Sequence, residues 1–135
     1  MNILAIDTTT KTACVSLKKE KELYTDKIEN EITHSEKLLP LIDKVLQNAN
    51  LKISEVNKLA CINGPGSFTG LRIGVTIAKT FAWGLNKDLY KVSSLFAMAS
   101  SITNSDYIIP LIDARRNYVF AAIYDKSYNV VMEEK

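Results

Sequence analysis

A glycine-rich loop that opens into a helix apolar on almost every side is the feature that most limits how this chain folds. The loop spans Gly64 to Gly70, and the spacing after it predicts a helix over Leu71–Leu85. Its apolar side chains lie nearly all the way round: Leu71, Ile73, Val75, Ile77, Ala78, Phe81, Ala82, Trp83 and Leu85. A helix of this kind is buried on more than one side. One side belongs on the chain's own sheet, and the other is covered either by a partner or by the rest of the same chain.

The segments before this loop have the patterns of strands followed by a helix. Short apolar runs with tight polar connections predict an antiparallel meander over Asn2–Ile6, Thr12–Leu17 and Leu23–Ile28. The spacing of Thr33 and Glu36 is that of a capping box, and a helix is predicted from Thr33 to Asn50. Its apolar face comprises Leu38, Leu39, Leu41, Ile42, Val45, Leu46 and Ala49.

The order of the elements indicates the fold class. Strands are predicted at Leu59–Asn63 and Leu89–Val92, and a helix at Ser94–Ile102. The resulting order βββαβαβα is that of an α/β lobe in which helices flank a mixed sheet.

The strand pattern of the N-terminus returns near the other end of the sequence. Asn2–Asp7 aligns with Ile108–Asp113 at an offset of 106 residues, and each is followed by a polar turn and a second apolar strand, Thr12–Leu17 or Tyr118–Tyr124. We therefore predict two related lobes, one over residues 1–103 and an incomplete one over 104–135 that is the start of a β-hairpin. The length of 135 residues fits one lobe and the beginning of another, in a natural short form or a fragment. The second lobe's strands would need cover from the first lobe or from another chain.

Composition excludes several classes of protein. The 17 basic and 15 acidic residues give a net charge of +2, which is too balanced for a dedicated nucleic-acid binder. No apolar run approaches the roughly 20 residues that a membrane helix needs. Cys14 and Cys61 lie in strand-like runs and predict buried, reduced thiols in a cytoplasmic protein.

Two segments have residue types suited to binding phosphate. A turn at Asp7, Thr8 and Thr9 follows the first strand, and such a carboxylate with hydroxyls can hold a metal-bound phosphate or simply satisfy its own backbone. In the loop, Gly64 and Gly66 allow close backbone approach at a helix N-terminus, either to an anion or to a neighbouring element. The loop is not a P-loop, because no Gly-Lys-Ser/Thr follows.

Histidine chemistry is excluded by count. His34 is the single histidine in the sequence, and it lies beside Thr33 and Ser35 at a predicted helix start. Neither a histidine-based triad nor a zinc site can be built from it.

Three motifs together carry a family resemblance. Ile3-Leu-Ala-Ile-Asp-Thr-Thr-Thr10, Thr33-His-Ser-Glu-Lys-Leu-Leu-Pro40 and Asn63-Gly-Pro-Gly-Ser-Phe-Thr-Gly-Leu-Arg-Ile-Gly74 resemble the TsaB (YeaZ) family over essentially the whole chain. The resemblance implies an actin-like ATPase (ribonuclease H-like) lobe of the sugar-kinase and Hsp70 superfamily. It also implies a role in making threonylcarbamoyladenosine on tRNA, at the adenosine 3′ of the anticodon.

The resemblance further implies partners rather than an activity of its own. The family pairs with its catalytic homologue TsaD, joined by the ATPase TsaE, or forms a homodimer in isolation, and it meets tRNA through the complex. TsaD relatives carry a helical His-x-x-x-His pair that binds the catalytic metal, and the matching positions here are Ser94 and Met98. No intrinsic cofactor or metal is therefore expected, while ATP or ADP and Mg²⁺ belong to the complex.

The same resemblance identifies the expected partner surface. In the family, the helices matching Thr33–Asn50 and Gly70–Leu85 pack on those of TsaD or of a second copy. The candidate interface residues are Leu38, Ile42, Val45, Ile73, Ile77 and Phe81. Two alternatives stay open: a phosphotransferase or ATPase using Asp7 and the 64–70 loop, and a glycoprotease-like peptidase.

Overall fold

A five-stranded mixed sheet with strand order β3-β2-β1-β4-β5 is the centre of the larger unit in this computed structural model, which describes residues 1–29 and 34–134. The strands of this sheet are β1 (Asn2–Asp7), β2 (Thr12–Lys19), β3 (Glu22–Glu29), β4 (Lys58–Ile62) and β5 (Asp88–Val92). The first three pair antiparallel, as the predicted meander requires, whereas β4 and β5 run parallel to β1. The mixed α/β lobe expected from the element order is thus confirmed.

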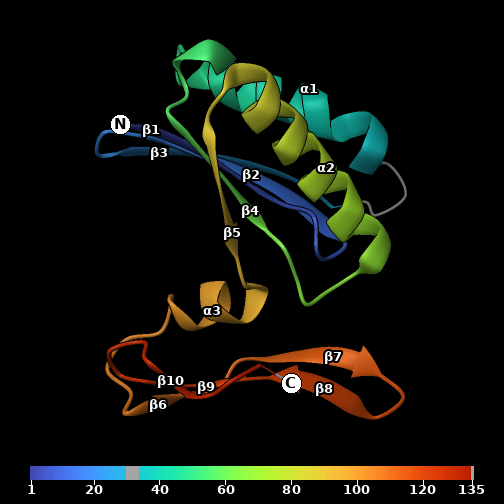
Figure 1. Ribbon diagram of the computed structural model, residues 1–135, viewed down its shortest axis with the longest axis vertical. Helices are drawn as coiled ribbons and strands as arrows, with labels where there is room; N and C mark the ends of the chain where they lie inside the picture. Colours follow the sequence, from blue (N-terminus) through green and yellow to red (C-terminus); the bar gives the residue numbers. More distant parts are fainter. Residues whose placement is uncertain (30–33, 135) are drawn as a thin grey trace.

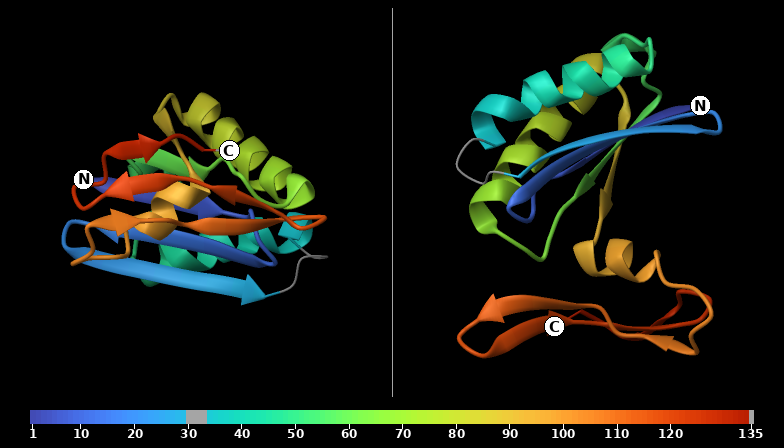
Figure 2. Two further views of the ribbon diagram at one scale, coloured as in Figure 1. Left: turned by 90° about the horizontal axis from the view of Figure 1, so that it is seen from below. Right: turned by 180° about the vertical axis from the view of Figure 1, so that it is seen from behind.

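Two helices cover one face of this sheet, and they lie side by side in Figures 1 and 2. They are α1 (His34–Asn48) and α2 (Phe68–Leu85), and a short 3-10 turn, η2 (Ile53–Glu55), leads from α1 toward β4. The capping box predicted at Thr33 lies outside the described residues. The other predicted helix begins three residues earlier than expected, because Ser67 caps it by accepting the backbone N–H of Gly70 at 3.4 Å.

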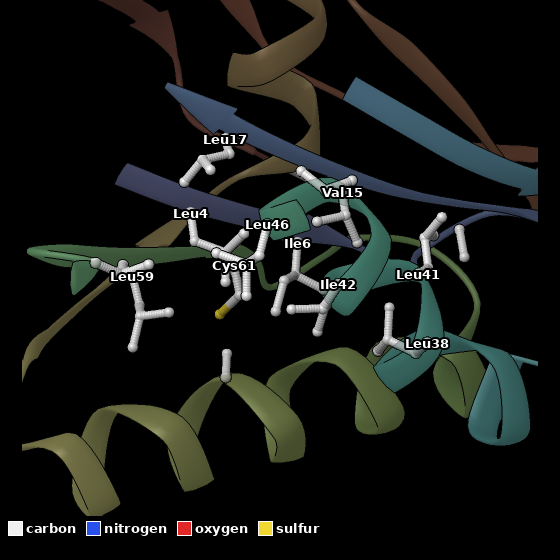
Figure 3. Packing of buried hydrophobic residues seen from close by; sticks show 14 of the residues in the cluster. Leu4, Ile6, Val15, Leu17, Leu38, Leu41, Ile42, Leu46, Leu59 and Cys61 are labelled. Atoms are coloured by element: carbon white, nitrogen blue, oxygen red, sulfur yellow. The ribbon is translucent and has the colours of Figure 1, made fainter. Parts of the chain in front are cut away.

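The core lies between the sheet and these two helices (Figure 3). Alternate strand residues point into it, since successive side chains of a strand face opposite sides. Its fully buried side chains include Leu4, Ile6, Val15, Leu17, Leu59 and Cys61 from the strands. From α1 it receives Leu38, Leu41, Ile42, Val45, Leu46 and Ala49.

The two helices contribute to the core in different ways. The residues that α2 buries completely are all small: Gly70, Gly74, Ala78 and Ala82. They recur every four residues and so form one stripe along the helix. Its larger apolar side chains, such as Ile73, Ile77 and Phe81, are half-buried at the flanks. Because its buried residues are small, α2 packs close to the sheet. Most of its larger apolar side chains lie at the flanks of the helix or on its outer face.

A smaller unit follows β5 and lies on the opposite side of the sheet from α1 and α2 (Figure 1). Its elements are α3 (Ser94–Ala99), β6 (Tyr107–Ile108), β7 (Leu111–Arg115), β8 (Tyr118–Ala121), β9 (Ile123–Asp125) and β10 (Val130–Met132). Its own cluster joins Leu95 and Ala99 of α3 to Ile108, Ala122 and Tyr124. By side-chain packing, α3 therefore belongs to this unit, although the expected boundary lay at residue 103.

The predicted hairpin of the second lobe is present but interrupted. Tyr107 pairs with Asp125 and Leu111 with Ala121, so β6–β7 and β8–β9 share one antiparallel register across a break at Pro110. Proline has no backbone N–H to donate to the ladder. Much of the apolar surface here is open to solvent, with Ile109 at 57% and Leu111 at 54% exposure. That this unit is the beginning of a lobe like the first stays a prediction.

The helix Ser94–Ile102 expected from sequence ends at Ala99. Among the described residues, no helix is long and apolar enough to cross a membrane.

Candidate functional site

The turn after β1 is closed by its own hydrogen bonds. Oδ1 of Asp7 accepts the backbone N–H of Thr9 at 2.9 Å and the hydroxyl of Thr9 at 2.7 Å. Oγ1 of Thr8 donates to the carbonyl of Gly70 and accepts the backbone N–H of Gly74 at 3.1 Å. Thr8 and Thr9 are both buried. The hydroxyls that the sequence offered to a phosphate are therefore committed to the protein.

Three glycines of the loop and helix sit directly on this turn. A Cβ on Gly66 would lie 2.6 Å from the carbonyl oxygen of Thr9, and one on Gly70 or Gly74 would overlap Thr8. The backbone N–H of Ser67 also donates to the Thr9 carbonyl at 2.7 Å. The space that these glycines leave is thus occupied by the threonines. The glycines of this loop therefore admit the threonines rather than a phosphate, and no lysine occurs between Gly64 and Gly70.

Gly64 allows the backbone conformation that connects the loop to α3. Its φ of 105° lies where residues with a Cβ are strained, so glycine is required at this position. Its carbonyl accepts the backbone N–H of Ser94 at 2.9 Å, and the hydroxyl of Ser94 donates to the carbonyl of Pro65. The loop is in this way attached to the start of α3.

The two positions that would carry metal-binding histidines in a TsaD-like helix have other roles here. Ser94 is 7% exposed and ties α3 to the loop, whereas Met98 is 46% exposed. Within residues 1–29 and 34–134, no three side chains of His, Cys, Asp or Glu come together as a metal site.

Asp7 also borders a hollow on the sheet face away from α1 and α2. This cavity, of about 320 Å³, is lined mostly by apolar or small side chains, among them Ala5, Cys14, Ala60, Ile62 and Val92. No basic side chain lines it.

Both cysteines are free, and Cys61 is buried in the core as the sequence predicted. The prediction is wrong for Cys14, which is only half-buried because its side chain lies on the opposite face of the sheet. Burial raises the pKa of the Cys61 thiol, although Lys91 and Lys79 act in the opposite direction. A thiol in this environment stays protonated and unreactive.

The outer face of α2 exposes two large aromatic side chains beside an open groove. Phe68, Arg72 and Thr76 follow one another at four-residue spacing, and with Thr69, Ile73 and Ile77 they line an open groove of about 450 Å³. Phe68 is 71% exposed, and Trp83, further along the same helix, is 89% exposed. Large exposed aromatic side chains of this kind mark protein–protein contact sites.

The candidate interface residues divide between the two helices. Leu38, Ile42 and Val45 of α1 are buried in this chain's own core, so they are not available to a partner. An amphipathic pattern reveals an apolar face but does not say which surface covers it. Ile73, Ile77 and Phe81 of α2 remain half-exposed at or beside the groove.

The sequence reading missed the most exposed members of this surface. The all-round apolar pattern predicts that Trp83 is covered, and the sequence places Phe68 in the loop. Arg72 lies inside the predicted helix Leu71–Leu85 but is not among the predicted interface residues. The available signals were the four-residue spacing of Phe68 and Arg72 and the lack of any acidic residue between Phe68 and Leu85.

Comparison with known proteins gives the same family at the level of sequence and of structure. The family model described as TsaD, tRNA N6-adenosine threonylcarbamoyltransferase, matches residues 29–135. A Bacillus subtilis protein named tRNA threonylcarbamoyladenosine biosynthesis protein TsaB is 37% identical over 126 residues, covering 92% of this chain and 55% of the relative. Its namesake from Haemophilus influenzae is 36% identical over 89% of this chain and 52% of the relative.

A solved structure agrees. YeaZ from Pseudomonas aeruginosa is 28% identical, has a TM-score of 0.89, and is matched over 99% of this chain and 66% of its own. This chain spans about half the length of the curated relatives it matches.

Proposed function

This chain belongs to the TsaB (YeaZ) family, which has the actin-like ATPase fold, and on that premise we propose that it is a non-catalytic subunit of the machinery that makes threonylcarbamoyladenosine on tRNA. The reaction is assigned to the catalytic homologue TsaD, which adds the group to the adenosine 3′ of the anticodon. The role of this chain is to bind TsaD and to organise it together with the ATPase TsaE.

The observation that carries the proposal is the exposed apolar outer face of α2. Phe68 and Trp83 are 71% and 89% exposed, and Phe68 lines an open groove that extends to Ile77. Burying large aromatic side chains contributes strongly to protein association. A helix whose small residues face its own sheet and whose aromatic residues face outward is suited to a second protein.

Two features of the site support a partner role over an activity of its own. Ser94 and Met98 occupy the positions of TsaD's metal-binding histidines, and a hydroxyl and a thioether do not replace imidazoles on a catalytic metal. The Asp7 turn and the glycine loop are bonded to each other, and this contact does not favour a phosphotransferase site at these two segments. Among the described residues, no cluster of His, Cys, Asp or Glu favours a metallopeptidase.

The remaining parts of the proposal follow from the family. In isolation the chain forms a homodimer through the same α2 surface, and TsaD takes this dimer apart. Transfer RNA is met through the complex, in keeping with a net charge of only +2. Any ATP, ADP and Mg²⁺ belong to the complex, and the proposed location is the cytoplasm.

The test is the mass of a mixture of this chain with TsaD, measured by light scattering. We expect a complex containing one copy of each. The substitution Trp83→Asp, on an 89% exposed residue that the fold does not need, is expected to weaken it. Tyr107→Asp, 65% exposed in the smaller unit, is the matched control and should leave binding unchanged. If light scattering finds only the separate masses of the wild-type chain and of TsaD in the mixture, the proposal is wrong.

A further inference from the structure

Resting on the proposed function, we propose that the partner surface docked on α2 is acidic as well as apolar, with carboxylates facing Arg72 and Lys79. The argument comes from the charges on the groove itself.

The outer face of α2 carries positive charge without any negative charge. Arg72 and Lys79 are the charged residues of the helix, and no Asp or Glu occurs between Phe68 and Leu85. Residues seven apart lie two turns apart on the same face of a helix, so both cations border the exposed aromatic surface. Any partner that covers Phe68 and Trp83 must therefore also cover or approach these two cations.

Neither cation has an ion-pair partner among the residues that the structure describes. Among the described residues, ion pairs join Lys27 to Glu29 and Lys44 to Asp26, and neither involves α2. The positive charge of the groove is thus free to act on a partner.

Arg72 is also held in a defined position. Its guanidinium carbon lies 5.5 Å from the centroid of the Phe68 ring, in a cation–π contact between two residues that line the groove. A planar guanidinium already held on an aromatic ring loses little freedom when it binds a carboxylate with two hydrogen bonds. Covering it with a purely apolar surface would instead leave a desolvated charge without a partner, which is strongly unfavourable.

A second copy of this chain fits this surface less well than an acidic partner. When α2 packs on α2 of another copy, two Arg72 and two Lys79 side chains enter one interface, and α2 brings no carboxylate to meet them. Like charges brought together at an interface disfavour the complex. The affinity of the homodimer should therefore increase with salt concentration, because salt screens this repulsion. The affinity for an acidic partner should decrease, because salt screens the attraction between opposite charges.

The experiment measures the affinity of this chain for TsaD at low and high NaCl. Raising salt and introducing the double substitution Arg72→Glu/Lys79→Glu should each weaken binding, the substitution by on the order of tenfold or more. Lys18→Glu, an exposed charge reversal on β2, is the matched control and should change the affinity little. The homodimer of the chain alone should show the opposite dependence on salt.

The outcomes separate this inference from the function on which it rests. If TsaD binds and Trp83→Asp weakens the complex, but neither salt nor Arg72→Glu/Lys79→Glu does, the acidic partner surface is wrong and the proposed function stands. If TsaD does not bind the wild-type chain at any salt concentration, both are wrong.

Discussion

The hydroxyl oxygen of Thr8 accepts the backbone N–H of Gly74 at 3.1 Å, and this bond joins the first turn of the chain to the second turn of α2. Both groups are buried, and the glycine has no Cβ to hold the helix away from the threonine. The motif residues at the two ends of this contact lie 66 positions apart in the sequence. Thr8 and Gly74 attach α2 to the turn after β1. This contact also sets the rotation of α2, and so which of its side chains face outward.

Adding a methyl group at Gly74 should therefore destabilise the fold. In Gly74→Ala the new Cβ overlaps the Thr8 hydroxyl, and we expect a loss of about 1–3 kcal/mol in the free energy of unfolding measured in urea. Gly84→Ala is the control on the same helix, because nothing lies within 4 Å of its Cβ position. It should stabilise the chain by about 0.5–1 kcal/mol, since alanine favours helix. Equal effects of the two substitutions would contradict the close packing at Thr8.

Removing the Thr8 hydroxyl tests the hydrogen bonds themselves. Thr8→Val keeps the shape of the side chain but leaves the Gly74 N–H and the Gly70 carbonyl without their buried partner. We expect a cost of about 1–3 kcal/mol in urea unfolding. The same change at exposed Thr76 should stay within about 0.5 kcal/mol. A Thr8→Val variant as stable as wild type would show that the turn is held by other contacts.

The ion pair between β3 and α1 predicts a dependence of stability on pH. The Lys44 ammonium, 2.8 Å from the carboxylate, lowers the pKa of Asp26 below its ordinary value of 3.8. The stabilisation is complete above the unfolded pKa and is lost as the pH falls through the folded-state value. Asp26→Asn should thus be slightly destabilising at neutral pH, and the difference from wild type should disappear in acid. Asp88→Asn, exposed on β5, is the control, and a difference that persists at low pH would refute the assignment.

The closed turn and loop predict that the isolated chain does not bind nucleotide. Calorimetry with ATP and Mg²⁺ should give no heat of binding, because the Thr8 and Thr9 hydroxyls are bonded within the protein and no lysine lies in the glycine loop. A TsaE ATPase titrated under the same conditions serves as the positive control. Magnesium-dependent heat that disappears in Asp7→Ala would instead support the phosphotransferase alternative.

Periodicity in the sequence was enough to predict the architecture of the larger unit. Alternating apolar residues in Thr12–Leu17 and the apolar runs at Leu59 and Leu89 gave the strands, since each buries one face or both. The start of α2 was less predictable, because Phe68-Thr69-Gly70 has the composition of a loop. This stretch is helical because Ser67 caps the helix and because Gly70 packs directly against Thr8.

The site was less predictable than the fold, for two physical reasons. Glycines that admit a phosphate and glycines that admit a threonine have the same sequence pattern, and Gly66 and Gly74 prove to be of the second kind. Likewise, Leu38 and Ile77 both belong to apolar helix faces, yet the first is covered by this chain's own sheet and the second borders an open groove.

The central claim, that the outer face of α2 binds TsaD, is tested most directly by hydrogen–deuterium exchange of the full chain with and without TsaD. We predict slower exchange on binding in Phe68–Leu85 and unchanged exchange in the exposed strands Tyr107–Met132 of the smaller unit. Protection confined to the smaller unit, or no protection in α2, would contradict the claim.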